Sequence, residues 1–325
     1  MLDVLIGALA WLHTLTPPLA WLVVGAFVAG TALEYYDRHR EWARRLTVAA
    51  WVLFGLFWLS LIWYYVFDLK SFIEAIGAFV AVPLSAYVGY LLWQGRDSLF
   101  VLSRAIAVMG IVFLPFSAVP FLRQFIIETV TAQTEMLMNG LGFHPEVISG
   151  AAVPGTNFRP YRSTFKWVTP DGHQITYTIR IACTAVGSMA IFAGIVAAVR
   201  APFRRKLRAL AVVLPVIYAL NLLRNVFIGV SFGKQYFGIA PDLIMTLFAS
   251  NDPYKVSYFV VDRILAQSLS VVALVVLTWF LVRELPEVLA IIEDVLFVVT
   301  GSEYDLQEAL GAPTPEGGSP TPDGD

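Results

Sequence analysis

The sequence has few charged side chains for its length. Charged residues make up 14% of the 325 residues, whereas soluble domains carry about 25%. The apolar residues, 58% of the chain, come in long blocks, and several blocks reach the ~20 residues that a helix needs to cross a bilayer. The composition excludes an ordinary soluble protein and predicts a polytopic membrane protein.

The scarcity of cysteine, of net charge and of known motifs excludes further classes of protein. The single cysteine, Cys183, rules out an internal disulfide framework and any zinc site that needs two thiolates. The net charge of −2 and the lack of a basic stretch interleaved with aromatics argue against a nucleic-acid partner. The HExxH and G-x-S-x-G motifs are absent, and GVSFGKQ at 229–235 falls one residue short of a P-loop. We expect no cofactor and no metal, and Cys183 is either an apolar filler or a lone nucleophile.

The apolar blocks predict the fold class. It is an all-α polytopic membrane protein with about seven to eight transmembrane helices and one extracytoplasmic segment that contains a short helix and a β-hairpin. Residues 2–16 are short for a span and form an interfacial helix or a marginal crossing, and Asp3 argues against a cleavable signal peptide. The clear spans are expected at about 19–36, 46–67, 75–93, 99–122, 182–200, 209–231 and 257–282.

Positive charge predicts the orientation of these spans, because cytoplasmic loops carry an excess of Lys and Arg. One basic cluster follows the first clear span and a second follows the fifth: Arg38, Arg40, Arg44 and Arg45; Arg200, Arg204, Arg205, Lys206 and Arg208. Both clusters fit the cytoplasm. Segment 123–181 and the loop near 232–256 then face outward from a multi-pass protein of the cell membrane.

The outward segment and the C-terminal region have patterns of their own. Phe125–Leu141 has helical apolar spacing, and a hairpin is expected from Thr164–Val168 and Ile175–Ile181 around Pro170-Asp171-Gly172. In 284–300, Leu285, Leu289, Ile292 and Leu296 form a stripe with Glu287 and Asp294 off it, so this acidic helix is expected to pack on the protein. The expected domains are N-terminal helices at 1–122, the extracytoplasmic segment at 123–181, candidate catalytic helices at 182–282, a cytoplasmic acidic helix at 283–310 and a disordered tail at 311–325.

Ionisable residues within spans are costly and are therefore functional candidates. Arg104 lies near the inner end of its span, where snorkelling is cheap, and is interpreted as structural. Arg224, flanked by Asn221 and Asn225, lies roughly 5–8 Å inside the outer boundary. Arg263, preceded by Asp262, lies at a similar depth, and Cys183 begins its span on the same side. Three spans thus bring a thiol and two guanidinium groups to one level.

This combination suits nucleophilic chemistry. Thiolate is the reactive form of cysteine, and cations or a helix N-terminus favour it. Arginine is always charged, so it cannot be the base, but it can hold a thiolate or an oxyanion. Of the four histidines, only His144 and His173 could approach Cys183, and the sequence establishes no Cys–His dyad. The candidate catalytic residues are Cys183, Arg224 and Arg263, with Asn221, Asn225, Asp262 and Ser188 as candidate substrate-binding residues.

ACTAVGS around Cys183, NLLRN around Arg224 and the Asp262-Arg263 pair resemble the signature of the exosortase/archaeosortase family over residues 160–285. The resemblance implies an intramembrane cysteine transpeptidase. Its partners would be secreted proteins, such as surface-layer glycoprotein, whose C-terminal sorting signal has a Pro-Gly-Phe motif, a hydrophobic helix and a basic end. Cys183 would attack at the motif, and a membrane phospholipid would accept the acyl group. Family members have His or Arg at the third position; this chain has Arg263, which leaves the base unassigned. The excess of Arg over Lys is compatible with a haloarchaeal source.

Two other interpretations remain. A multi-span transporter or anion-binding membrane protein would use Arg224 and Arg263 to hold a carboxylate or phosphate, although no repeat relates two halves of the chain. A non-catalytic assembly factor for envelope biogenesis would need neither the thiol nor the arginines for chemistry.

The orientation can be tested through the single thiol. We expect a membrane-impermeant thiol reagent to label Cys183 in intact cells, because the positive-inside pattern predicts that Cys183 lies near the outer surface of the membrane. Labelling is read by mass spectrometry of the purified chain. Labelling confined to inverted vesicles would contradict the orientation.

Overall fold

Six helices are long and apolar enough to cross a membrane. The computed structural model describes residues 2–36, 39–68 and 72–306. Within them the candidate spans are Thr16–Tyr35, Arg40–Asp68, Glu74–Trp93, Asp97–Ala118, Phe203–Gly233 and Lys255–Glu284. The largely helical, multi-span class is confirmed. The expected disordered tail at 311–325 lies outside the described residues.

The expected count of seven to eight spans is not confirmed, because two apolar stretches form short helices. The stretch predicted at 182–200 contains α7 (Val186–Ala198), which has 13 residues. At 1.5 Å per residue it is about 20 Å long, against a hydrocarbon core of ~30 Å. It is shortened because η5 (Ile181–Cys183) is a 3₁₀ turn and Ala185, with φ +63°, separates it from α7. The helix α1 (Leu2–Thr14) is equally short.

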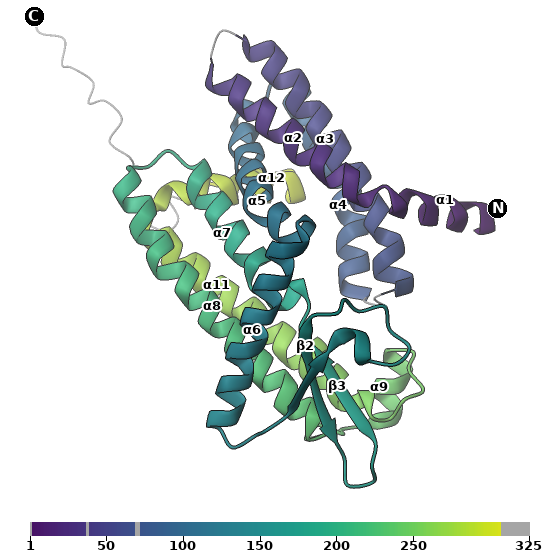
Figure 1. Ribbon diagram of the computed structural model, residues 1–325. Helices are drawn as coiled ribbons and strands as arrows, with labels where there is room; N and C mark the ends of the chain where they lie inside the picture. Colours follow the sequence, from purple (N-terminus) through teal and green to yellow (C-terminus); the bar gives the residue numbers. More distant parts are fainter. Residues whose placement is uncertain (1, 37–38, 69–71, 307–325) are drawn as a thin grey trace, which may run out of the picture. The chain divides into compact units, whose positions relative to one another are not determined.

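The described chain forms two compact units. The first unit contains most of the N-terminal elements, in which α2, α3 and α4 pack side by side (Figure 1). Its core includes Phe27, Trp51 and Leu92, all almost fully buried. Its elements are α1, α2 (Thr16–Tyr35), α3 (Arg40–Trp63), η2 (Tyr64–Asp68), α4 (Phe72–Trp93), η3 (Asp97–Leu99), most of α5 (Phe100–Ala118), most of α7, η7 (Pro286–Val288) and α12 (Leu289–Thr300).

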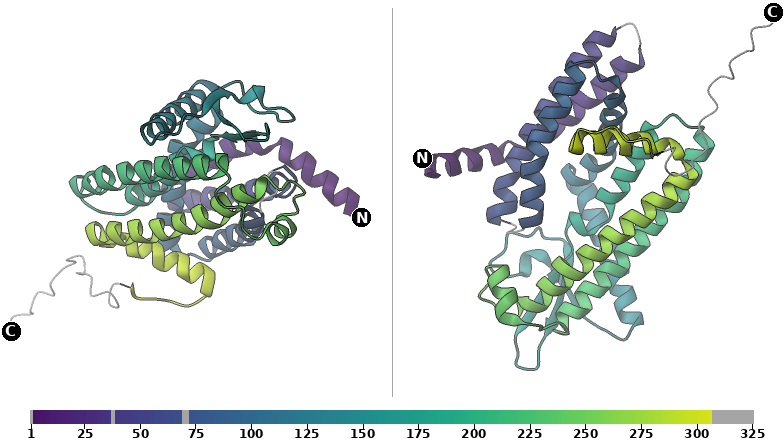
Figure 2. Two further views of the ribbon diagram at one scale, coloured as in Figure 1. Left: turned by 90° about the horizontal axis from the view of Figure 1, so that it is seen from below. Right: turned by 180° about the vertical axis from the view of Figure 1, so that it is seen from behind.

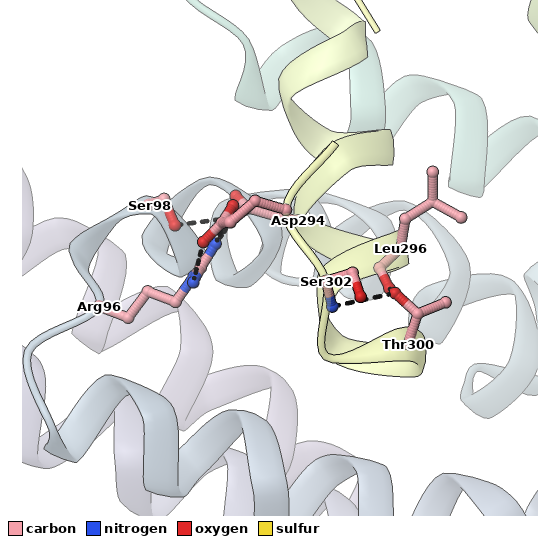
Figure 3. Close-up of polar contacts among 7 residues, drawn as sticks. Arg96, Ser98, Asp294, Leu296, Thr300 and Ser302 are labelled. Carbon is pink, nitrogen blue, oxygen red and sulfur yellow. Dashed lines mark hydrogen bonds and ion pairs between the residues drawn. The ribbon is translucent and has the colours of Figure 1, made fainter. Parts of the chain in front are cut away.

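The acidic helix predicted at 284–300 is present as η7 and α12, and α12 packs against α4. One part of that prediction is wrong: Asp294, expected off the packed face, is buried. Figure 3 shows why its carboxylate is tolerated there: Ser98 donates a 2.7 Å hydrogen bond to Asp294, and Arg96 lies 3.8 Å away. Burial raises the pKa of the Asp294 carboxyl, although Ser98 and Arg96 oppose that rise.

The second unit contains a three-stranded antiparallel sheet in the order β1-β2-β3. The predicted hairpin is confirmed as β2 (Arg162–Val168) and β3 (Gln174–Thr178), with Phe165 opposite Tyr177. The third strand, β1 (Glu146–Ser149), was not predicted. β3 ends before the expected Ile181, because the chain turns into η5. The predicted helix at 125–141 is confirmed as α6 (Pro120–Gly140).

The remaining elements of this unit include its two long apolar helices. They are η4 (Gly150–Ala152), η5, most of α8 (Phe203–Gly233), α9 (Pro241–Leu247), α10 (Lys255–Tyr258), η6 (Phe259–Ala266) and most of α11 (Gln267–Glu284). The η6–α11 helix runs beside α8 in Figure 1 and in both views of Figure 2. The buried face of the sheet joins α6 and α8 in one core around Phe165, Met138 and Ile228.

Close approach between α8 and the sheet depends on glycine. A Cβ at Gly233 would lie 2.3 Å from the Trp167 ring, and a Cβ at Gly229 would lie 3.3 Å from the Tyr177 ring. A rigid indole cannot move aside as a flexible side chain can. Gly233 therefore sets how near α8 comes to β2.

We predict that Gly233→Ala destabilises the protein by about 1–3 kcal/mol, because overpacking outweighs the gain in helix propensity. Gly140→Ala is the matched control: Gly140 also ends a helix of this unit, and nothing lies within 4 Å of its Cβ position. Thermal unfolding in detergent measures both. Equal unfolding temperatures for the two variants would contradict the assigned packing.

Candidate active site

Cys183 lies at the end of η5, between β3 and α7. It is a free, half-buried cysteine that packs at the edge of the second unit's core. Its backbone N–H donates to the Arg180 carbonyl at 2.8 Å, which closes the 3₁₀ turn. The turn places the thiol-bearing residue three positions ahead of Val186, where α7 begins. The partial positive charge of a helix N-terminus is therefore close in sequence to Cys183.

Two asparagine side chains hold the backbone of Cys183. The Nδ2 atoms of Asn221 and Asn225 each donate a 2.8 Å hydrogen bond to the Cys183 carbonyl oxygen. Residues four apart lie on the same face of a helix, so one face of α8 supplies both donors. The carbonyl precedes α7 and takes its partners from α8. Asn221 and Asn225, predicted to bind substrate, contact the backbone of Cys183.

A tyrosine from the sheet completes this arrangement. The Tyr177 hydroxyl donates a 3.1 Å hydrogen bond to Oδ1 of Asn225. Tyr177 is 6% exposed and Asn225 is fully buried. Burial raises the pKa of the Tyr177 phenol well above its usual range, and the nearby Cys183 and Asp262 add to that effect. Tyr177 therefore stays protonated and remains a donor at neutral pH.

The two candidate arginines meet at one carboxylate. Nη2 of Arg224 lies 2.7 Å from Oδ1 of Asp262, and Nε of Arg263 lies 3.6 Å from Oδ2 of the same side chain. Asp262 and Arg263 belong to η6, a π-helical stretch of eight residues. Such stretches are rare and frequently occur at functional sites. Tyr258, one turn earlier, hydrogen-bonds to Asp262 as well.

Cys183 and this charged group are neighbours. Cys183, Asp262 and Tyr258 all lie within electrostatic range of the Arg224 guanidinium. Cys183 and Arg263 are both within the same range of Tyr258. Six of the seven candidate catalytic and substrate-binding residues therefore come together: Cys183, Asn221, Arg224, Asn225, Asp262 and Arg263.

The other candidates lie apart from these contacts. Ser188 is half-buried in the first turn of α7 and joins none of the hydrogen bonds described above. His144 contacts Asn139, and the His173 ring stacks on Tyr254 with 3.8 Å between centroids. Arg104, interpreted as structural, pairs with Glu34 at 3.8 Å in the first unit. Within residues 2–36, 39–68 and 72–306, no group of three or more His, Cys, Asp and Glu side chains is arranged to hold a metal ion.

Two polar residues of the site, Tyr177 and Tyr258, were not singled out in the sequence. A signal for Tyr177 existed. Alternation in β3 puts Tyr177 on the same face as Ile175 and Ile179, and a tyrosine on a buried face usually finds a partner for its hydroxyl. A signal for Tyr258 existed as well, because it lies four residues before Asp262 within the predicted span 257–282 and residues four apart share a helix face.

Comparison with known proteins identifies the family of the chain. A family model described as transmembrane exosortase matches residues 11–250. The chain is 50% identical to archaeosortase A of Haloferax volcanii over 303 residues, which is 90% of this chain and 97% of that protein. The chain belongs to the transmembrane exosortase family.

A second exosortase-family relative gives the same result. Archaeosortase A of Natronomonas pharaonis is 40% identical over 312 residues, 93% of this chain and 95% of that protein. No solved structure matches the chain. The resemblance stated from Cys183, Arg224 and the Asp262-Arg263 pair is confirmed at the level of the family, and this exosortase is a multi-pass membrane protein.

The ion pair at the site gives a stability prediction. Asp262→Ala leaves Arg224 without its carboxylate, and we expect a loss of about 2–3 kcal/mol. That is below the ~3–5 kcal/mol of a fully buried pair, because 24% of the Arg224 side chain is exposed. Denaturant unfolding in detergent is the measurement.

Glu146→Ala is the control for that prediction. Glu146 pairs with Lys166 at 3.0 Å in the same unit but is 62% exposed, so its loss should cost less than about 1 kcal/mol. Adding Arg224→Ala to Asp262→Ala should recover part of the stability, since the guanidinium that Asp262 pairs with most closely is then removed as well. A double variant that is less stable than Asp262→Ala would contradict the assigned pairing.

Proposed function

We propose that this exosortase is a cysteine transpeptidase that cleaves a C-terminal sorting signal of secreted proteins and transfers the new C-terminus to a membrane lipid. One observation carries the proposal: a short polar segment of α8 supplies both asparagines on the Cys183 carbonyl and the arginine that lies in electrostatic range of Cys183. The names of the two relatives support the same class of activity.

Cys183 is the nucleophile in this proposal, and it reacts as the thiolate. Arg224, Arg263 and the N-terminus of α7 supply positive charge, and positive charge lowers the free energy of a thiolate relative to a thiol. The arginines stay charged and do not accept the proton. That proton passes to water on the outer side before the substrate closes the site.

The chemistry then follows two steps. The thiolate forms a bond to the carbonyl carbon of the scissile peptide, and the negative charge that develops on the carbonyl oxygen is stabilised by Arg224. The C–N bond breaks, the leaving amine takes a proton from water, and a thioester to Cys183 remains. An amine on a lipid headgroup attacks the thioester, releasing the thiol and leaving the protein joined to the lipid.

Asp262 acts on the arginines in this scheme. Its two oxygens face Arg224 at 2.7 Å and Arg263 at 3.6 Å. A planar guanidinium that is held on one side by a carboxylate presents its other N–H groups in a fixed direction. Asp262 is thus a positioning residue for Arg224 and Arg263.

The orientation of the chain supports the choice of substrate. A sorting signal with a basic end keeps that end in the cytoplasm, and its hydrophobic helix then places the preceding motif at the outer leaflet. The positive-inside pattern of this chain puts the level of Cys183 at the same leaflet. The proposed substrates are secreted proteins with a Pro-Gly-Phe-type motif, surface-layer glycoprotein among them.

The two asparagines argue against the transporter or anion-binding alternative. That alternative uses Arg224 and Arg263 and gives Cys183 no role, whereas Asn221 and Asn225 both hold the backbone of Cys183.

The proposal predicts that Cys183→Ala abolishes processing of the sorting signal while the protein is still inserted. Cys183→Ser should fail as well, because a hydroxyl stays protonated at neutral pH where a thiol can ionise. Processing is followed by the shift in mass of a secreted substrate in cells. Processing at the wild-type rate by Cys183→Ala would contradict the proposal that the protein is a cysteine transpeptidase.

The geometric role of Arg224 predicts that Arg224→Lys loses most activity, by about 10²–10³-fold, since lysine keeps the charge but not the planar fork. The activity of Arg263→Lys should fall less if Arg263 mainly orients Asp262. Arg104→Lys is the control, because Arg104 pairs with Glu34 in the first unit. This variant should process the substrate normally. Equal processing by all three variants would show that charge alone is sufficient.

A further inference from the structure

We propose that Tyr177 is a positioning residue for Cys183, acting through Asn225 as a hydrogen-bond relay from the sheet to the nucleophile's backbone. This inference rests on the proposed function and assigns to that site a residue outside the charged group. The relay has two bonds: Tyr177 hydroxyl to Asn225 Oδ1 at 3.1 Å, and Asn225 Nδ2 to the Cys183 carbonyl at 2.8 Å.

The relay has a fixed direction because of what each group can donate. A carboxamide has one acceptor end and one donor end. The protonated phenol of Tyr177 gives its hydrogen to Oδ1, so Nδ2 of Asn225 must face the Cys183 carbonyl. In the reversed amide, Oδ1 would face the carbonyl oxygen and two acceptors would meet in a buried place, where an unsatisfied polar group is costly.

Full burial makes the relay specific. Asn225 is 0% exposed and Tyr177 is 6% exposed, so water is not at hand to replace a lost bond. Asn221 binds the same carbonyl but is only half-buried. Without the phenol hydroxyl, Asn225 can turn over, and one of the two donors on the Cys183 carbonyl is lost.

The orientation of the Cys183 peptide sets where its thiol lies. The carbonyl is held by α8 and the N–H by Arg180, so the residue is fixed on both sides of its α-carbon. Loss of one carbonyl bond lets the peptide rotate and moves the thiol relative to Arg224 and the start of α7. A displacement of about 1 Å in such a site costs on the order of 10²-fold in rate. The same displacement takes the sulfur farther from the Arg224 guanidinium, and a more distant cation favours a thiolate less.

The test uses Tyr177→Phe, which removes one hydroxyl and keeps the ring. Because Cys183 is the only cysteine, its alkylation by iodoacetamide reports on this thiol alone. We expect the alkylation–pH profile to move to higher pH with an unchanged plateau, and kcat for processing to fall by about 10- to 100-fold with little change in KM. A role in packing alone would lower the unfolding temperature and leave the profile in place.

Tyr218→Phe is the matched control. The Tyr218 hydroxyl donates to Gln133 within the same unit, and that bond does not lead to Cys183. The alkylation profile and the processing rate of this variant should equal those of the wild type. An equal shift in both tyrosine variants would overturn the assignment to Tyr177.

A double variant tests whether the effect passes through Asn225. Asn225→Ala should move the profile in the same direction, and adding Tyr177→Phe to it should change nothing further, because both residues serve one bond. Additive shifts would overturn the relay. So would an unmoved profile in either single variant, and the Asn225→Ala result decides the matter if Tyr177→Phe does not fold.

The outcomes also separate this inference from the proposed function. Loss of processing in Cys183→Ala combined with an unmoved profile in Tyr177→Phe rejects the relay and keeps the transpeptidase. Normal processing by Cys183→Ala rejects the transpeptidase whatever the alkylation profile shows.

Discussion

Polar side chains on an apolar helix must find partners within the protein, and this constraint organises the second unit. Hydrocarbon offers no hydrogen bonds, so unpaired polar groups at that depth are expensive. Asn221, Arg224 and Asn225 lie within about one turn of α8, and two other parts of the chain supply their partners. The asparagines hold the Cys183 carbonyl, and Arg224 holds Asp262. The same bonds that satisfy α8 therefore bring the turn η5 and the π-helical stretch η6 to one place.

The sheet also contributes to this site, through Tyr177 in β3. The chain runs from Tyr177 in β3 through η5 to Cys183 in seven residues, so the strand and the turn that carries Cys183 are positioned together. Gly229 and Gly233 let α8 approach the rings of Tyr177 and Trp167, which a larger residue would hold away. The residues of the site thus lie on helices, on one strand and on a short 3₁₀ turn, and none of them lies on a long loop.

Residue chemistry in the sequence predicted which residues lie together better than apolar length predicted the number of spans. Cys183, Arg224 and Arg263 stood out because ionisable and nucleophilic groups are rare in apolar helices. The hairpin was predictable from alternation around Pro170-Asp171-Gly172. The stretch 182–200 is not confirmed as a full span, because composition does not reveal that Cys183 ends a 3₁₀ turn and that the helix begins only at Val186. Asp294 was misplaced because its burial depends on Ser98 and Arg96, almost 200 positions away in sequence. Tyr177 was missed because its partner, Asn225, lies in another element.

The central claim is that Cys183 carries the acyl group of a cleaved substrate as a thioester. Incubating the purified protein with a peptide that contains a Pro-Gly-Phe-type sorting signal, then quenching in acid, allows intact mass spectrometry of any adduct. The account predicts an added mass equal to the N-terminal part of the peptide, located on Cys183, removed by hydroxylamine and absent in Cys183→Ala. Cleavage of the peptide with no adduct in the wild type, or with an unchanged rate in Cys183→Ala, would contradict it.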